Sequence, residues 1–411
     1  MSSTLTAPVQ PGERADVLDA LRGFALLGIC LANVAVFSLY VFMPEKEMMA
    51  LPTAKADMAL SFFHFMFIDG KFYTIFSLLF GIGFTIILLN NEKQGNSLAI
   101  FYRRLIVMIL LGLAHILLLW PGDILLLYAL LGLLLPFFRN CSDRTLIITA
   151  ICLVLSPLIF DLVKVLSHGS LNLANPLTDR AIAVDTHNGL TPENGRRWVM
   201  LHPNYRGIWE WNQGGFWWRW QGLLDTNRLP KVLGIFLIGL YVGRNQVYRH
   251  LEANREWLKK VCRWGIGTGL VTGVGFAYFE LFGEHLPKPA GLWQTLFYAL
   301  NVVPLGFGYA AGIALLWQKA NWRKVLAFIA PAGRMALTNY IGQTLIGICL
   351  YYGIGFGLGQ KVGPSVFLPI AILTWFIEVL WSRAWLSVFR YGPLEWIWRM
   401  LTYGKYLPIK K

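Results

Sequence analysis

The sequence predicts an all-α, polytopic integral membrane protein of about ten transmembrane helices. Of its 411 residues, 56% are hydrophobic and only 14% are charged, and the mean hydropathy is +0.53. Soluble domains usually carry about 25% charged residues, so this composition excludes an ordinary soluble enzyme and a disordered chain. A spanning helix needs about 20 mainly apolar residues, and the apolar content is sufficient for roughly ten such helices.

Ten apolar runs are long enough to be read as membrane spans. In chain order they are residues 21–43, 72–89, 105–120, 124–138, 145–166, 231–242, 261–282, 292–317, 325–351 and 364–388. Only Pro121, Gly122 and Asp123 separate the third run from the fourth, which predicts a tight helical hairpin. The apolar stretch 58–68 predicts a short helix that lies at the membrane interface or re-enters the membrane.

The spans divide the chain into two membrane halves with a long loop between them. Residues 198–220 of this loop contain six tryptophans. This density predicts either a belt of aromatic rings at the membrane interface or an external lid that stacks on a flat substrate such as a sugar. After the last span, Glu395 and Arg399 are four residues apart and predict an amphipathic helix. The expected units are an N-terminal membrane half (1–166), the loop (167–228), a C-terminal membrane half (229–388) and a tail helix (389–411).

The basic residues predict the orientation of the spans. Lysine and arginine number 36 against 22 acidic residues, and about two thirds of the basic residues fall on one side of the ten-span model. By the positive-inside rule this side, with both termini, is expected to face the cytoplasm. The loop 167–228 also carries arginines, among them Arg219 and Arg228, but long loops cross the membrane largely regardless of charge.

Polar side chains within the spans are the candidate functional residues, because they are costly in a bilayer. Arg22 and Asn33 are eleven residues apart in the first span, which places them on one helical face about 16 Å apart along the axis. Arg104 and His115 repeat this spacing in the third span, and Asp123 follows in the tight turn. A histidine beside a carboxylate is typical of acid–base chemistry, and the alternative is a structural tie between helices.

Further polar residues lie in the second and ninth spans. Lys71 enters the second span near its outer end, where it is either a functional cation or a lysine that snorkels to the interface. In the ninth span Asn339 and Gln343 are four residues apart, so they share one helical face. This face is predicted to be either a packed helix interface or a cavity wall, and Arg334 lies just before it.

Five ordered motifs resemble the YeiB-type family of bacterial inner-membrane proteins, which carry the domain of unknown function 418. The resemblance extends from about residue 18 to residue 401. The motifs are LDALRGFA at 18–25, KF at 71–72 with FSLLFG at 76–81, His115 with Trp120, GDIL at 122–125 and Tyr128, GRMALTNY at 333–340, and GPLEW at 392–396.

The first motif also resembles the transmembrane acyltransferases, which include the acyltransferase-3 proteins and the lysosomal heparan glucosaminide N-acetyltransferase. That resemblance implies a bundle of ten or eleven helices that takes an acyl group from cytoplasmic acyl-CoA, with acetyl-CoA as the expected donor. The acceptor on the far side is often a sugar hydroxyl or amine. In acyltransferase-3 proteins a catalytic histidine stands eleven residues after the arginine, whereas this chain has Asn33 there, which cannot be a general base. The heparan enzyme resembles this chain in having asparagine at that position and a histidine elsewhere.

An acyltransferase of this kind assigns a role to each polar residue. His115 is expected to deprotonate the acceptor, Asp123 to orient His115, and Asn33 to donate a hydrogen bond to the thioester oxyanion. Arginine binds phosphate through two parallel hydrogen bonds, so basic residues are expected to bind CoA phosphates. The residues predicted to bind the co-substrate are Arg22, Arg104, Arg334 and Lys71, and those predicted to bind the acceptor are Asn339, Gln343 and Tyr128.

Two alternatives remain on the sequence alone. One is a transporter or exporter that uses the same polar residues as a path for a small solute. The other is a scaffold that binds a partner through the tryptophan-rich loop. The five cysteines form no CxxC pair, so no metal is expected, and the basic surplus indicates membrane topology rather than nucleic-acid binding. A homodimer is expected, if formed, to use the small residues at 265–275.

Overall fold

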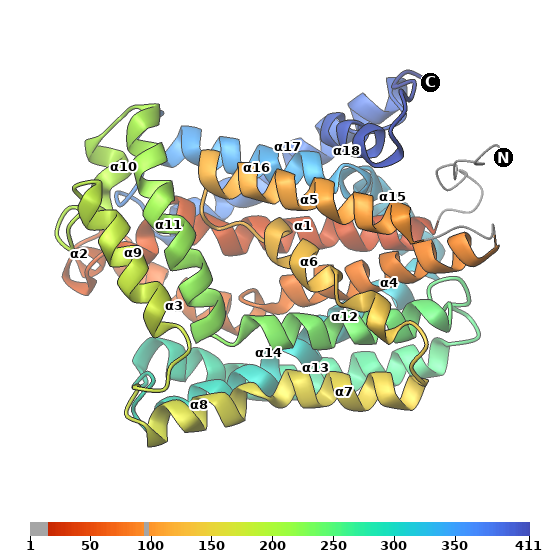
Figure 1. The fold of residues 1–411 in the computed structure, drawn as a ribbon, viewed down its shortest axis with the longest axis horizontal. Coiled ribbons are helices and arrows are strands. Elements are labelled where there is room, and N and C mark those ends of the chain that lie inside the picture. Colours follow the sequence, from red (N-terminus) through yellow and green to blue (C-terminus); the bar gives the residue numbers. More distant parts are fainter. Residues whose placement is uncertain (1–14, 94–97) are drawn as a thin grey trace.

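The chain folds into a bundle whose long helices run along one common direction (Figure 1). The computed structural model describes residues 15–93 and 98–411, apart from the side chains of residues 91–93. Within this part of the chain the regular elements are helices, with one isolated β-bridge between Phe389 and Lys410. The prediction of an all-α, polytopic membrane protein is confirmed.

In the described part of the chain, seven helical segments are long and apolar enough to cross a membrane. They are α1 (Asp16–Phe37), the segment Ala54–Asn90 that holds α3 (Ala54–Phe67) and most of α4 (Lys71–Lys93), α5 (Ala99–Leu118), the segment Asp143–Leu166, α13 (Arg255–Phe282), α14 (Gly291–Trp317) and α17 (Pro364–Val388). The other three expected spans correspond to shorter or interrupted helices. They are α6 (Leu125–Gly132) with η3 (Leu135–Phe138), α12 (Arg228–Arg244), and the pair α15 (Ala320–Arg334) and α16 (Ala336–Tyr351). The count of ten crossings stays a prediction.

Two of the expected spans are each divided between two helices. Residues 145–166 form α7 (Asp143–Leu155) and α8 (Pro157–Leu166), and the division falls at Pro157, which has no backbone N–H for the preceding helix. Residues 325–351 form α15 and α16, which are separated at Met335. Both divisions leave helix ends that other parts of the chain must cap.

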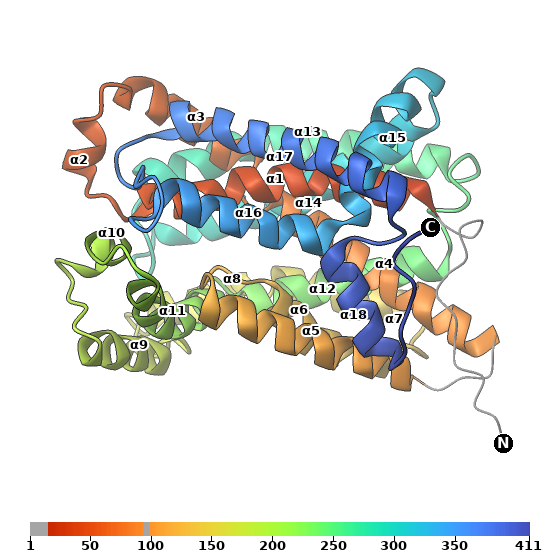
Figure 2. The same ribbon diagram turned by 90° about the horizontal axis from the view of Figure 1, so that it is seen from above.

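The two ends of the bundle differ in composition. One end carries α2 (Glu45–Met49), α9 (Asn175–His187), α10 (Trp198–Leu201) and α11 (Tyr205–Asp225), and we call it the tryptophan-rich end (Figure 1). The other end carries the start of α1, the end of α15 and α18 (Pro393–Tyr403), and we call it the basic end (Figure 2). Arg22 and Arg104 lie within the first two turns of α1 and α5, so they belong to the basic end.

The short helix α12 lies in the centre of the bundle. Val232, Ile235 and Phe236 are fully buried, as are Leu237 and Leu240 further along the same helix. Because α12 is covered on all sides, its 17 residues are surrounded by protein rather than lipid. Glycines allow this close packing: a Cβ placed on Gly239 would lie 2.4 Å from a backbone oxygen of α4.

The helices α13 and α14 form the longest pair in the bundle, and small residues bring them together. A Cβ on Gly265 would lie 2.4 Å from the carbonyl oxygen of Pro304, and one on Gly269 would lie 2.7 Å from Leu305. The face of α13 that was expected to serve a homodimer is therefore covered by α14 of the same chain at these positions. A dimer stays a prediction and would need another surface.

The α13–α14 contact provides a stability test with a control in the same helix. Gly265→Ala introduces a methyl group against backbone that cannot move aside, so we expect it to destabilise the fold by about 1–3 kcal/mol, despite the higher helix propensity of alanine. Gly267 has no atom within 4 Å of an added Cβ, so Gly267→Ala should leave stability unchanged or slightly higher. Thermal unfolding of the two variants in detergent measures the difference, and equal midpoints would contradict the packing described here.

Candidate functional site

A histidine, a carboxylate and a hydroxyl meet in the interior of the bundle. His115, in the last turn of α5, places Nδ1 2.8 Å from Oδ2 of Asp123, and its Nε2 lies 3.0 Å from Oγ1 of Thr344 on α16. The three side chains are almost entirely buried. The contact between His115 and Asp123, which sequence spacing alone could not establish, is therefore present in the structure.

The turn between α5 and α6 holds Asp123 in place. Oδ1 of Asp123 accepts a hydrogen bond from the backbone N–H of Leu126 at 2.7 Å, so the carboxylate also caps the start of α6. A Cβ on Gly112 would lie 2.6 Å from the same backbone nitrogen, so the glycine allows α5 to lie directly against α6. From the tryptophan-rich end, Nε of Arg219 on α11 donates to the carbonyl oxygen of Asp123 at 2.9 Å.

The hydrogen bonds around His115 define which ring nitrogen can accept a proton. An ionised carboxylate only accepts, so Asp123 takes a hydrogen bond from Nδ1–H, and in the neutral ring Nε2 is then the acceptor. The hydroxyl of Thr344 donates to Nε2, with the carbonyl oxygen of Tyr340 at 3.4 Å as a weaker alternative acceptor. This is the tautomer that a general base requires.

Tyr340 lies between this histidine and a cavity. Its ring centre is 5.2 Å from that of His115, and its hydroxyl is buried without a hydrogen-bond partner among the described residues. Tyr340 also lines a cavity of about 390 Å³ that includes Arg22, Arg104 and Arg399 at the basic end. The cavity wall follows the chain from Ala15 to Ile29, which corresponds to about 21 Å along α1.

The cavity is cationic at one end and apolar along its length. Four arginines line the cavity at the basic end: Arg22, Arg104, Arg249 and Arg399. Phenylalanines of α4 and α5 form much of the remaining wall: Phe76, Phe80, Phe84 and Phe101. Arg22 pairs with Asp19 at 2.6 Å. Arg104 has no carboxylate partner in the described part of the chain; its guanidinium stacks 4.0 Å from the ring centre of Trp398. Arg104 is therefore held in position while its donors remain available to an anion.

The structure brings some of the predicted co-substrate residues together and separates others. Arg22 and Arg104 share the cavity, and a Cβ on Gly333 would lie 1.9 Å from the carbonyl oxygen of Asp19, so the chain just before Arg334 touches the turn that carries Arg22. Lys71 is buried elsewhere, at the start of α4, where Nζ donates to the carbonyl oxygen of Phe65 at 2.5 Å. Lys71 does not line the cavity.

Asn33 and the predicted acceptor residues lie in different surroundings. Asn33 is half-buried on α1 and is not part of the cavity wall. Asn339 donates to Ser382 at 3.0 Å and Gln343 donates to Glu378 at 2.8 Å, so both tie α16 to α17. Tyr128 does line the cavity, and its hydroxyl is held by the carbonyl oxygen of Tyr73 at 2.9 Å.

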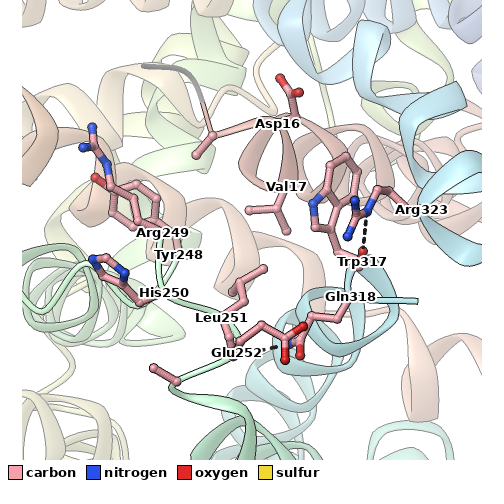
Figure 3. Close-up of a pocket in the computed structure, with 12 residues that line it drawn as sticks. Asp16, Val17, Tyr248, Arg249, His250, Leu251, Glu252, Trp317, Gln318 and Arg323 are labelled. Carbon is pink, nitrogen blue, oxygen red and sulfur yellow. Dashed lines mark hydrogen bonds between the residues drawn. The ribbon is translucent and has the colours of Figure 1, made fainter. Parts of the chain in front are cut away.

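A second cavity, of about 660 Å³, lies at the basic end near the start of α1 (Figure 3). Its lining mixes both charges, with Asp16 and Glu252 beside Arg249 and Arg323. Arg323 donates to the carbonyl oxygen of Trp317 at 3.0 Å. None of the predicted site residues lines this cavity, so it adds nothing to the site around His115.

Comparison with known proteins establishes the family. A model of proteins of unknown function (DUF418) matches residues 242–405. Over 98% of both chains, the sequence is 30% identical to the uncharacterized protein YxaH of Bacillus subtilis (strain 168). It is also 30% identical to the uncharacterized protein YeiB of Escherichia coli (strain K12), over 95% of this chain and 96% of that one. The chain belongs to the YeiB-type DUF418 family.

The descriptions of these DUF418 relatives identify the family but name no activity. An uncharacterized 39.9 kDa protein in the amylase 3′ region of Bacillus acidopullulyticus is 29% identical over 98% of this chain and 97% of its own length. No solved structure matches the chain. The family prediction is confirmed, and the activity has to be argued from the site.

Two motifs that carried the resemblance to the DUF418 family meet at the basic end. Glu395 of the GPLEW motif accepts hydrogen bonds from the backbone N–H groups of Leu337 and Thr338 at 2.7 and 3.1 Å, and from the hydroxyl of Thr338 at 2.6 Å. It thereby caps α16, the helix that follows the division at Met335. On the next turn of α18, Nε1 of Trp398 donates to the carbonyl oxygen of Arg104 at 3.1 Å.

Several residues around His115 were not among those predicted from the sequence. Tyr340 and Thr344 are four residues apart, exactly as Asn339 and Gln343 are, so the same spacing argument applied to them. Which of the two faces of α16 meets His115 depends on how the helix is rotated in the bundle, and spacing does not contain that information. The contact of Arg219 with the Asp123 turn likewise joins residues 96 positions apart.

The cap on α16 can be tested with a matched acidic residue. Glu395→Ala removes three hydrogen bonds from the start of α16, so we expect a loss of about 1–2 kcal/mol in stability, seen as a lower thermal unfolding midpoint. Glu256 also lies in the first turn of a helix, α13, but its side chain is exposed, so Glu256→Ala should cost less. A midpoint for Glu395→Ala no lower than that for Glu256→Ala would show that the cap does not support α16.

Proposed function

We propose that this DUF418 protein is a membrane-embedded acyltransferase that moves an acyl group from acyl-CoA, with acetyl-CoA as the expected donor, to an acceptor on the far side of the membrane or within it. The observation that carries this proposal is the cavity that joins the arginines of the basic end to Tyr340, the neighbour of His115. The cavity has a cationic entrance and a long apolar wall, as the phosphates and the pantetheine arm of an acyl-CoA require. Tyr340, which lines it, is the direct neighbour of the base His115.

The donor is proposed to bind with its phosphates at Arg22, Arg104 and Arg399. Arginine is suited to phosphate because its guanidinium forms two parallel hydrogen bonds. The pantetheine arm then follows the wall along α1, and the thioester reaches the level of Tyr128 and Tyr340. Both tyrosines line the inner part of the cavity.

His115 is proposed to be the general base, with Asp123 as the residue that positions it. The acceptor hydroxyl or amine gives its proton to Nε2 of His115, directly or through the hydroxyl of Thr344, as its oxygen or nitrogen bonds to the acyl carbon. The carbon–sulfur bond breaks, and the proton on His115 passes to the departing thiolate to give free CoA. The unpartnered hydroxyl of Tyr340 is close enough to this site to donate to the thioester oxygen, a role that sequence analysis gave to Asn33.

The proposed location is the bacterial inner membrane, with the basic end and both termini in the cytoplasm. The positive-inside rule supports this orientation, and it gives the cavity access to the cytoplasmic pool of acyl-CoA. On the other side, α11 covers the Asp123 turn: Tyr205 donates to the carbonyl oxygen of Leu118 at 3.1 Å, and Asn212 to that of Leu117 at 3.3 Å. In this orientation the tryptophan-rich end faces the far side of the membrane, and the acceptor is proposed to approach from there when α11 moves away from the Asp123 turn.

Binding and transfer by the purified protein test the proposal together. Arg104→Gln should weaken acetyl-CoA binding by roughly 10- to 100-fold, because a hydrogen bond to a charged group contributes about 1.5–3 kcal/mol. His115→Ala should keep the binding and lower acyl transfer by roughly 10²–10⁴-fold, the usual contribution of a general base. Titration calorimetry measures the first effect, and transfer of a radiolabelled acetyl group to membrane extract measures the second.

Arg103→Gln is the matched control, because Arg103 is the exposed neighbour of Arg104 and does not line the cavity. Absence of binding to the wild-type protein at roughly 1 mM acetyl-CoA would refute the proposal. Flux of a solute in proteoliposomes without a covalent product would instead favour the transporter.

Gly83 offers a second test of the same cavity. It lines the wall, and an added Cβ would have no atom within 4 Å, so the side chain of Gly83→Leu starts in free space at the cavity wall. We expect weaker acetyl-CoA binding at an unchanged unfolding midpoint. Gly222→Leu is the control, because Gly222 also has free space around it but lies on α11, outside the cavity. Equal affinities in the two variants would show that the donor binds elsewhere.

A further inference from the structure

Three basic side chains gather at the tryptophan-rich end, where the positive-inside rule predicts few. Arg219 lies near the end of α11, Arg228 begins α12, and Lys231 follows one turn later. Arg219 and Arg228 belong to the arginines of the long loop that did not fit the charge pattern of the membrane topology. Lys231 is only 4% exposed, and both arginines are half-buried.

Aromatic rings rather than carboxylates hold two of these cations. The guanidinium of Arg228 lies 4.2 Å from the ring centre of Tyr73, and the ammonium of Lys231 lies 4.0 Å from that of Tyr298. The hydroxyls of these two tyrosines are 3.1 Å apart, so the two cations sit on one hydrogen-bonded tyrosine pair. Arg228 also lies within electrostatic range of Arg219, whose Nε is bonded to the backbone of Asp123.

None of the three cations forms an ion pair with a carboxylate in the parts of the chain that the structure describes. Nε of Arg228 is buried without any hydrogen-bond partner there. The nearby carboxylate of Asp161 is already occupied: it pairs with Lys164 at 2.9 Å and accepts hydrogen bonds from two further side chains, those of Asn227 and Thr295, each at 2.7 Å.

Asp69 is the other acidic residue that acts on Arg228 and Lys231 at longer range. Asp69 also acts on Lys71, so the carboxylates near Arg219, Arg228 and Lys231 leave a local surplus of positive charge. A buried cation without a counter-ion is costly in a membrane protein, and such residues are functional candidates. Cation–π contacts offset part of this cost, but they leave the N–H donors of the cations unused.

We propose that Arg219, Arg228 and Lys231 form a phosphate-binding site at the tryptophan-rich end. A phosphate group can interact with all three neighbouring cations better than a carboxylate can, because it has more acceptor oxygens and carries up to two negative charges. Arg219 connects the site to the Asp123 turn and lies within electrostatic range of Tyr128 and Tyr340, which line the donor cavity, so the bound group lies close to the proposed reaction centre. Resting on the proposed function, the phosphate belongs to the acceptor, which is then a phosphorylated molecule or lipid.

The experiment uses the full-length protein in detergent, without acyl-CoA. Thermal unfolding is followed while sodium phosphate replaces sodium chloride at constant ionic strength, which yields an apparent phosphate affinity. Arg228→Gln and Lys231→Gln should each weaken this affinity about tenfold or more, as expected for the loss of one charge-assisted hydrogen bond. Arg219→Gln gives a third variant in case a substitution at the tyrosine pair prevents folding.

Two control variants separate this site from other cations. Arg206 lies on α11 like Arg219, but its side chain is 85% exposed and paired with Glu210, so Arg206→Gln should leave phosphate affinity unchanged. Arg104→Gln removes a cation at the basic end, which the proposed function assigns to the phosphates of CoA; it should weaken acetyl-CoA binding, while phosphate still stabilises the variant through Arg219, Arg228 and Lys231. The proposed phosphate site and the proposed acetyl-CoA site can therefore be confirmed or refuted separately.

A short-chain phosphatidic acid, with the matching diacylglycerol as control, then identifies the source of the phosphate. Displacement of inorganic phosphate by the phosphatidic acid alone would support a lipid headgroup, and no displacement would support a soluble phosphorylated acceptor. If phosphate does not stabilise the wild-type protein more than chloride does, the proposal is overturned. It is equally overturned if Arg104→Gln abolishes the stabilisation and the variants of the three cations keep it.

Discussion

In a hydrocarbon environment a polar side chain has only the rest of the protein as a partner, and much of the interior of this bundle is arranged around that restriction. Asn301 donates to the carbonyl oxygen of Gly269 at 2.7 Å and so ties α14 to α13. Gln343 reaches Glu378 and ties α16 to α17. Asp123 bonds both to His115 and to the backbone of α6. Each of these contacts joins two helices and fixes their rotation about their own axes. The polar side chains that are most costly to place in a membrane therefore also determine how the helices pack.

Several buried polar groups among the described residues lack such a partner, and three groups near the site stand out. The hydroxyl of Tyr340 and Nε of Arg228 are buried and unbonded among the described residues, and Arg104 is held by a tryptophan ring. Arg104 lies at the basic end and Arg228 at the start of α12, and Tyr340 lies beside His115. These are the groups on which the two proposed ligand sites depend.

The sequence predicts the parts of this protein that depend on local pattern. Apolar runs identify most of the long helices, and the three residues between the third and fourth apolar runs predict the hairpin that brings Asp123 to His115. The rotation of α16 was not predictable, because Asn339 and Tyr340 are adjacent and nothing in their spacing tells which faces α5. Glu395 was expected only to belong to an amphipathic helix, whereas its oxygens bond to a helix start 57 residues earlier in the chain. Contacts of this kind depend on how the bundle closes, which no local pattern records.

The position of α18 has a consequence for how the protein is made. Residues of α1 and α5 reach the membrane early in synthesis, but the groups that cap α16 and hold Arg104 come from Glu395 and Trp398, near the end of the chain. During translation the spanning helices are therefore inserted well before the site at the basic end has all its supports. A chain that stops after α17 would contain these spanning helices but lack the contacts that Glu395 and Trp398 make with α16 and α5.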